Sequence, residues 1–138
     1  MDFGKKGIHM LKLEHLAWEL PGGEEIIRDI DFSAPDGKLI VVTGPNGGGK
    51  TSLAKLVAGL ETPSAGKIWF DGEDITGLDV TERAKKGIAY AFQQPVRFKG
   101  LTVRDLLELA AGGSLGEDAL CGLLSKVGLC ANEYIDRE

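Results

Sequence analysis

The sequence predicts an α/β domain in which a mostly parallel sheet carries a glycine-rich loop, preceded by antiparallel strands and followed by helices. Three observations lead to this fold. The continuous apolar run 39–42 is typical of a strand buried on both faces, and the glycine-rich stretch 44–49 follows it closely. An amphipathic helical pattern comes next, at 50–59. Strand and helix patterns then alternate up to residue 94, and only helical patterns follow.

Two strands joined by a turn are expected near the N-terminus. Apolar residues recur with a period of two between residues 11 and 20, which predicts a strand, and Pro21-Gly22-Gly23 predicts a turn. The isoleucines and the phenylalanine between residues 26 and 32 predict a second extended segment. Asp36-Gly37 then predicts a hairpin-like turn that leads into the apolar run 39–42.

The elements beyond the first helix continue the alternation. Residues 66–70 predict a strand. Asp79 with Glu82 predicts the capped start of a helix that ends by Gly87. Residues 88–92 predict a short buried strand, which would be the last strand before the helical region.

The C-terminal region is predicted to be helical. Thr102 with Asp105 is typical of a helix cap, Gly112 interrupts the helix that follows, and Gly128 ends the next one. The predicted organisation has three parts, namely an extension or disordered segment at 1–9, a phosphate-loop core at 10–94 and the start of a helical subdomain at 95–138.

Composition and charge exclude several function classes. Apolar residues make up 43% of the 138 residues and charged residues 27%, which is the balance of a globular protein with a packed core. The net charge of −5, without a basic stripe, argues against a nucleic-acid partner. No apolar run approaches the roughly 20 residues of a membrane span, and the N-terminus lacks the apolar stretch of a signal peptide. We therefore expect a cytoplasmic chain that reaches a membrane only through a partner.

The glycine-rich loop fits the phosphate-binding pattern G-x-x-x-x-G-K-[ST] at every fixed position. Its residues are Gly44, Pro45, Asn46, Gly47, Gly48, Gly49, Lys50 and Thr51, and Ser52 follows them. Glycines let the backbone wrap closely around an anion, so that successive N–H groups point inward. The helix that begins near Lys50 adds the positive end of its dipole. We expect the stretch 44–52 to bind the phosphates of a nucleotide.

Two side chains of this loop have expected roles of their own. Lys50 is expected to reach the β- and γ-phosphates as a mobile point charge, which makes it a catalytic candidate. The Thr51 hydroxyl is expected to coordinate Mg²⁺. The alternative is a glycine-rich turn that only ends a strand. The predicted strand before the loop and the predicted helix after it argue against that alternative.

From Leu11 to its end, the sequence resembles the ATP-binding-cassette (ABC) ATPases. The opening Gly-Pro-Asn-Gly of the loop is typical of that family, as is the order of segments in IIRDIDFSAPDGKLIVVTGPNGGGKTSLAKLVAGLETPSAGKIWFDGEDIT. The stretch 62–68 with Asp71-Gly72 is similar to the family's link from the first helix back into the sheet. The resemblance implies a P-loop NTPase core that binds ATP and Mg²⁺, followed by the start of the family's helical subdomain.

The resemblance also implies two site residues outside the loop. The family has a glutamine at the end of a strand, and Gln93 matches it, with Gln94 as a neighbouring candidate. Its amide is expected to reach Mg²⁺ and the attacking water, so Gln93 is a catalytic and metal-binding candidate. Family members stack adenine on an aromatic residue of an early strand. Trp18 is the aromatic residue at hand, although a gap-free comparison places the usual position nearer Leu20. The alternative is that Trp18 is simply a residue of the core.

The chain departs from the family's pattern near its C-terminal end, at Glu138. The family's Ser-Gly-Gly signature, its acidic strand motif with the catalytic glutamate, and its later histidine are not among the 138 residues. The resemblance therefore implies the N-terminal part of a nucleotide-binding domain, truncated before the signature. We expect this chain to bind ATP with little or no hydrolysis, because water then has no general base.

The cellular role has three alternatives. In the first, the chain belongs to the ATP-binding subunit of an ABC transporter. Its full-length form would pair as a homodimer or heterodimer, and residues from about 95 to 138 would dock onto a membrane permease. In the second, it belongs to the branch that assembles iron–sulfur clusters on a soluble scaffold, which residues 92–96 and 134–138 resemble. In the third, it is a non-catalytic nucleotide-binding module.

Overall fold

The described residues fall into two compact units. The structure, a computed structural model, describes residues 10–94 and 96–137. The first unit ends at Ala91 and the second begins at Phe92. The extension predicted at 1–9 lies outside the described residues, and the predicted domain boundary after residue 94 stays a prediction.

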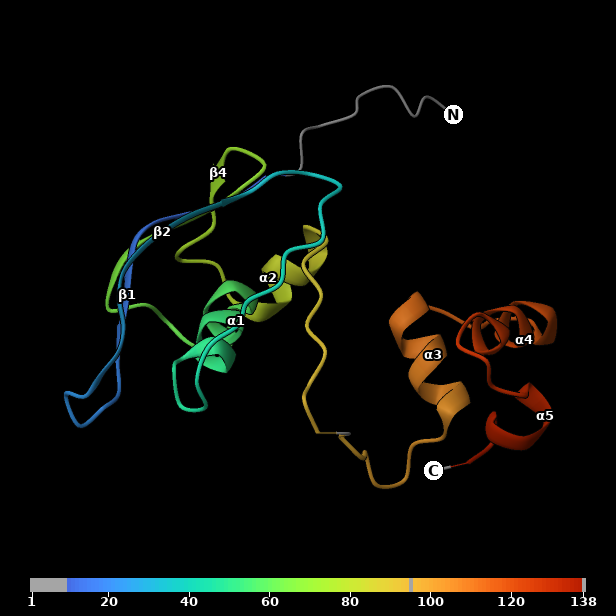
Figure 1. The fold of residues 1–138 in the computed structure, drawn as a ribbon. Helices are drawn as coiled ribbons and strands as arrows, with labels where there is room; N and C mark the ends of the chain where they lie inside the picture. The colour runs from blue at the N-terminus through green and yellow to red at the C-terminus, as the bar shows by residue number, and fades with distance from the viewer. Residues whose placement is uncertain (1–9, 95, 138) are drawn as a thin grey trace. The chain divides into compact units, whose positions relative to one another are not determined.

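The first unit contains a four-stranded sheet in the order β2-β1-β3-β4, in which every pairing is antiparallel (Figure 1). Its strands are β1 (Leu11–Glu19), β2 (Glu25–Ala34), β3 (Ala65–Phe70) and β4 (Glu73–Asp74). A turn at residues 21–23 joins β1 to β2, where the Gly23 amide donates to the Leu20 carbonyl at 2.8 Å. The two strands predicted near the N-terminus are confirmed, and Leu13 and Leu16 of β1 are buried in a core.

That core lies between the sheet and helix α1 (Lys50–Ala58). Its buried members come from three strands, from α1 and from the loop after β4, and they are Leu13, Leu16, Ile27, Ile68, Leu56 and Ile75. Leu53 and Val57 of α1 pack against the same cluster, as the amphipathic pattern predicts. Gly59 ends the helix with a φ of 81°, a left-handed conformation that glycine adopts at little cost.

Helix α2 (Val80–Lys85) follows the sheet and lies beside α1 (Figure 1). The Asp79 side chain accepts from the Glu82 amide at 2.8 Å, and the Glu82 carboxylate accepts from the Asp79 amide at 3.0 Å. This reciprocal capping satisfies two backbone donors that the helix itself leaves unpaired. The predicted cap is therefore confirmed at both residues.

Two predicted strands are not formed in the described structure. The sequence predicts strands at 39–42 and 88–92, yet neither segment is a strand, and Leu39 is 90% exposed. A buried parallel strand needs hydrogen-bonded neighbours on both edges. The four strands of the described sheet pair only with one another. The mostly parallel sheet is thus a wrong prediction for the described residues, whereas a mixed α/β fold with an antiparallel N-terminal sheet is confirmed.

The second unit is helical, with α3 (Val103–Ala111), α4 (Glu117–Lys126) and α5 (Ala131–Tyr134). Leu120 and Leu124 of α4 and Ile135 form its buried cluster. The chain returns to the start of α3, where the Val103 amide donates to the Arg137 carbonyl at 2.9 Å. Among the described residues, no helix has the length and apolar character needed to cross a bilayer.

Candidate functional site

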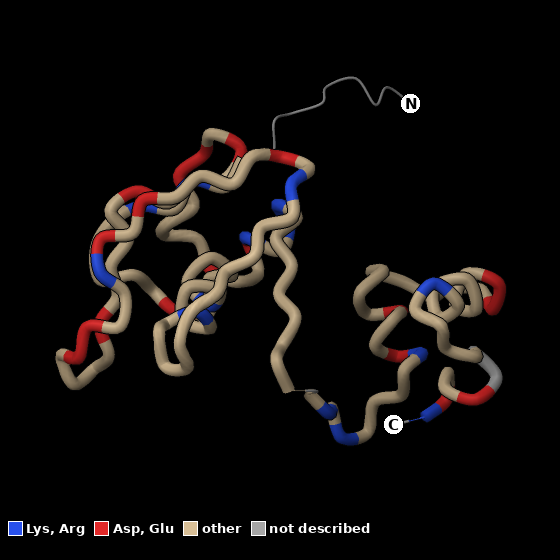
Figure 2. The backbone as a smooth tube through the Cα atoms, viewed as in Figure 1, with Lys and Arg blue, Asp and Glu red and all other residues tan. Residues whose placement is uncertain are grey.

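The predicted phosphate loop lies between β2 and α1 in the first unit. Residues 39–49 carry no Lys, Arg, Asp or Glu, so a long uncharged stretch of backbone leads into the helix (Figure 2). Residues 43–48 are exposed, and Lys50 is half-buried. An anion that approaches this loop therefore meets no acidic side chain belonging to the loop itself.

The loop backbone has the close-wrapped form that its glycines permit. Gly47 and Gly49 have φ angles of 80° and 77°. The Gly48 amide donates to the Pro45 carbonyl at 3.1 Å and closes a tight turn. A Cβ atom at Gly49 would lie 3.1 Å from the carbonyl oxygen of Ile26 on β2. The positive φ and the close approach to β2 together exclude an unstrained side chain at Gly49.

Helix α1 begins directly at this loop, and its first turn is open to an anion. In the described part of the chain, no side chain caps the helix at Gly49, and the first turn contains no acidic residue. The backbone N–H groups of a first helical turn have no partner within the helix. Together with the helix dipole, such N–H groups attract a phosphate or another anion.

The Lys50 side chain folds back over the opening of the loop. Its Nζ donates to the carbonyl oxygens of Gly44 at 2.8 Å and Pro45 at 2.5 Å. Both acceptors are neutral, so these bonds hold the ammonium group at the loop without neutralising its charge. The positive charge stays available to an anion bound there. Thr51 and Ser52 follow in the first turn of α1, with Thr51 exposed and Ser52 half-buried.

The remaining predicted site residues belong to other parts of the chain. Trp18 lies on β1, where it is half-buried against the core and pairs with Ile27 of β2. Gln93 and Gln94 are exposed and belong to the second unit. The roles expected of Trp18 and Gln93 in adenine stacking and Mg²⁺ binding stay predictions.

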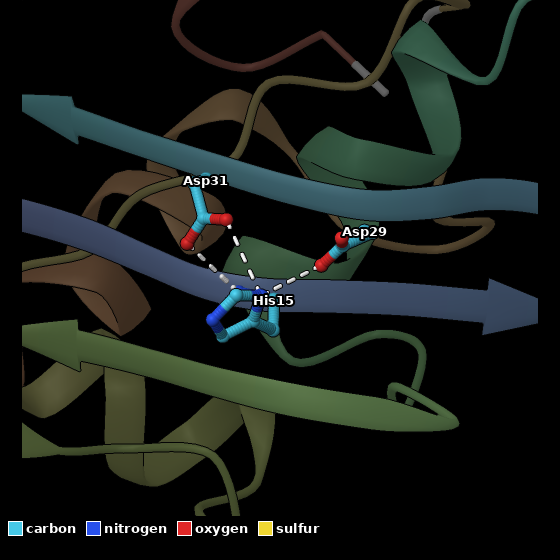
Figure 3. Close-up of side chains that lie close together, drawn as sticks. All are labelled: His15, Asp29 and Asp31. Carbon is cyan, nitrogen blue, oxygen red and sulfur yellow. Dashed lines mark hydrogen bonds and ion pairs between the residues drawn. The ribbon is translucent and has the colours of Figure 1, made fainter.

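A cluster of three polar side chains that was not predicted lies on β1 and β2 (Figure 3). The His15 Nδ1 atom lies 2.7 Å from a carboxylate oxygen of Asp29 and 3.4 Å from one of Asp31. The hydrogen bond to Asp29, followed by the charge of Asp31, raises the pKa of the His15 imidazole. No spacing motif could have indicated this cluster, because irregular strand pairing brings the residues together.

Comparisons with known proteins show the family of the chain. The family model for the ABC transporter family matches residues 27–135. An ABC transporter ATP-binding protein of Methanocaldococcus jannaschii is 33% identical over 94% of this chain and 55% of its own length. The cell division ATP-binding protein FtsE of Escherichia coli is 36% identical over 87% of this chain and 57% of its own.

A solved structure extends the likeness to the fold. The ATP-binding subunit of an ABC transporter superposes with a TM-score of 0.74 at 26% identity, covering 93% of this chain and 53% of that one. The chain thus spans about half the length of the relatives it matches. The family match includes the glycine-rich loop and parts of both units. This chain therefore belongs to the ABC transporter ATP-binding family.

Proposed function

We propose that the loop 44–52 binds the phosphates of ATP together with Mg²⁺, as the nucleotide-binding part of an ABC transporter ATPase. The observation that carries the proposal is the position of Lys50. Its ammonium group is held against the Gly44 and Pro45 carbonyls, beside a helix start that no side chain caps among the described residues. The charge of Lys50, the backbone N–H groups of the loop and the dipole of α1 then all attract one bound anion.

The residues of the loop fit a nucleotide phosphate by their chemistry. The N–H groups of the loop and of the first turn of α1 bind phosphate oxygens, and Lys50 offsets their negative charge. Thr51 offers a hydroxyl ligand to Mg²⁺, and Gln93 an amide oxygen. The bound ion supplies charge neutralisation and a fixed orientation of the phosphates. Trp18 is proposed to stack on the adenine ring.

In the protein to which this chain belongs, we propose that ATP hydrolysis drives transport. The family description supports this role, as do the transporter names of the archaeal relative and of the superposed subunit. Two such ATPase domains would pair, and a permease subunit would hold them at the inner face of a membrane. The iron–sulfur assembly alternative rests on the resemblance of residues 92–96 and 134–138 alone.

A nucleotide titration tests the binding proposal. The affinity of the chain for a fluorescent ATP analogue with Mg²⁺ is measured for the wild type, for Lys50→Ala and for Lys38→Ala. Lys38 is an exposed lysine that precedes the loop. Lys38→Ala removes the same charge as Lys50→Ala and serves as the control. We expect Lys50→Ala to weaken binding about tenfold or more, because a charge-assisted contact to phosphate is lost.

The same titration has an outcome that overturns the assignment. If Lys50→Ala and Lys38→Ala both bind as tightly as the wild type, Lys50 does not contact the nucleotide. Circular dichroism of each variant shows whether a loss of affinity reflects a loss of fold. To test the role in transport, the full-length protein is purified from whole-cell extract together with its bound partners. Recovery of a permease subunit supports transport, and recovery of a soluble scaffold with bound iron and sulfide supports assembly.

A further inference from the structure

We propose that His15, Asp29 and Asp31 form a binding site for a divalent transition-metal ion, with Zn²⁺ as the best-suited probe. The ligand atoms of the three residues, one from each, all lie within 4.8 Å of one another. Figure 3 shows the imidazole of β1 facing both carboxylates of the neighbouring strand β2. The site uses no residue of the phosphate loop, so it does not depend on the proposed function.

The geometry is close to that of a coordination sphere. Zinc binds imidazole nitrogen and carboxylate oxygen at roughly 2.0–2.2 Å, which places neighbouring ligand atoms roughly 3 to 3.6 Å apart. In the structure, the His15 Nδ1 atom is 2.7 Å from Asp29 and 3.4 Å from Asp31. The side chains are 77%, 74% and 58% exposed for His15, Asp29 and Asp31, so they are free to adjust by small rotations. The same exposure lets water complete the sphere.

The strand pairing aims these side chains at one point. The register of β1 against β2 shifts between Leu13 and Leu16 and again between Leu16 and Trp18. His15 lies within the first shift, and its amide donates to an Asp31 carboxylate oxygen at 3.1 Å. Register shifts of this kind re-aim side chains within a sheet. Three ligands are therefore held by two hydrogen-bonded strands rather than by a mobile loop.

The charge balance also favours a cation. With the imidazole neutral, the cluster carries two carboxylate charges, which one divalent ion neutralises. The basic neighbours along the strands are engaged elsewhere, because Arg28 pairs with Glu25 and Lys12 with Glu14. One nitrogen and two oxygen ligands suit Zn²⁺, Mn²⁺ and related ions, whereas Mg²⁺ and Ca²⁺ prefer oxygen alone. The site should therefore discriminate against the ion that accompanies ATP.

The test needs a background in which other zinc ligands are removed. The chain contains two histidines and two cysteines. Replacing His9 by Gln, and Cys121 and Cys130 by Ala, leaves His15 as the one imidazole and leaves no thiol. Zn²⁺ binding to this nucleotide-free chain at neutral pH is followed by calorimetry. The His15 ring resonances are followed by NMR, which reports coordination through Nδ1.

Four variants in that background separate a metal site from an ordinary ion pair. His15→Asn, Asp29→Asn and Asp31→Asn each remove one ligand. Asn is among the residues that tolerate the positive φ angles of 47° at His15 and 44° at Asp29. Asp36→Asn, at an exposed position in the turn after β2, removes an equal charge and serves as the control.

We expect one Zn²⁺ per chain, with about tenfold or weaker binding after each ligand change and less than about twofold change in the control. Excess Mg²⁺ should not compete. The proposal is overturned if the background chain binds no Zn²⁺ up to about 1 mM, since the cluster is then an ion pair only. It is equally overturned if any of the three ligand variants binds Zn²⁺ as tightly as the background chain.

Discussion

The guanidinium of Arg83 on α2 donates a hydrogen bond of 2.6 Å to the carbonyl oxygen of Leu56, near the C-terminal end of α1. The same side chain also donates to the carbonyls of Val57, Thr76 and Leu78 at 3.0 Å each. Arg83 is 1% exposed, and its burial lowers the pKa of the guanidinium. A buried cation with four neutral acceptors thus links α1 to the segment that precedes α2.

Removing the Arg83 side chain should destabilise the first unit more than removing the side chain of an exposed arginine does. Arg83→Met removes the guanidinium donors from four carbonyl oxygens, of which that of Leu56 still accepts from the Gly59 amide at 3.2 Å. We expect a loss of about 3 kcal/mol in the free energy of unfolding. Arg83→Lys should lose less, since it keeps a donor. Both tryptophans, Trp18 and Trp69, lie in the first unit, so their fluorescence in a urea titration reports this unit alone.

The matched control for this measurement is Arg28→Met. Arg28 is 75% exposed and pairs with Glu25 on the surface of β2. Exposed ion pairs of this kind contribute little, and we expect a change of less than about 0.5 kcal/mol. Equal losses in Arg83→Met and Arg28→Met would show that the buried hydrogen bonds of Arg83 do not stabilise the unit.

Gly49→Ala should damage both the stability of the first unit and nucleotide binding. The φ angle of 77° is unfavourable for alanine, and the new Cβ would lie 3.1 Å from the Ile26 carbonyl oxygen. We expect a loss of about 2 kcal/mol in the urea titration and weaker binding of the ATP analogue. Gly22→Ala is the control, because a Cβ atom at Gly22 would meet nothing within 4 Å and the φ there is not positive. A fully stable Gly49→Ala chain would contradict the close approach of the loop to β2.

Trp18→Leu should weaken ATP binding by about tenfold, because stacking of a base on an aromatic ring is worth roughly 1–3 kcal/mol. Leucine keeps the apolar contact with the core that Trp18 makes in the structure. Trp69→Leu is the control, since Trp69 lies on β3 and its indole N–H donates to Glu14 at 2.7 Å. An unchanged affinity in Trp18→Leu would assign Trp18 to the core alone.

The cap of α3 predicts a change of stability at acidic pH. The Thr102 amide and hydroxyl donate to the Asp105 carboxylate at 2.8 Å and 2.7 Å, and these bonds lower the pKa of Asp105 in the folded chain. A lowered pKa means that the stabilisation is present above the unfolded value, about 3.9, and is lost as the pH falls through the folded value. Helix α3 should therefore lose stability only in that acidic range.

Thr102→Val isolates the hydroxyl's share of this effect. The variant keeps the backbone donor, so the pKa of Asp105 should rise toward its ordinary value without reaching it. An NMR titration of the Asp105 carboxyl carbon measures both values, with Asp105→Asn used to assign the resonance. Identical titration curves for the wild type and Thr102→Val would rule out the hydroxyl as a cause of the shift.

The conformation of the glycine-rich loop and the helix caps depend on residues that are neighbours in the chain. The glycines of 44–49, Lys50 and the start of α1 are positioned by local backbone geometry, so the order of residue types was enough to predict them. The pairs Asp79–Glu82 and Thr102–Asp105 were predicted for the same reason, and both capping boxes are formed.

Whether a segment forms a strand, and which side chains meet across the sheet, depends instead on segments elsewhere in the chain. The apolar runs 39–42 and 88–92 indicate a preference for burial, but a strand forms only where another strand offers hydrogen bonds, and none does so among the described residues. His15 meets Asp29 because register shifts in the β1–β2 pairing turn both side chains to one point. Tertiary structure alone decided these features, because pairing register and long-range hydrogen bonds arise between segments whose spacing in the sequence carries no signal.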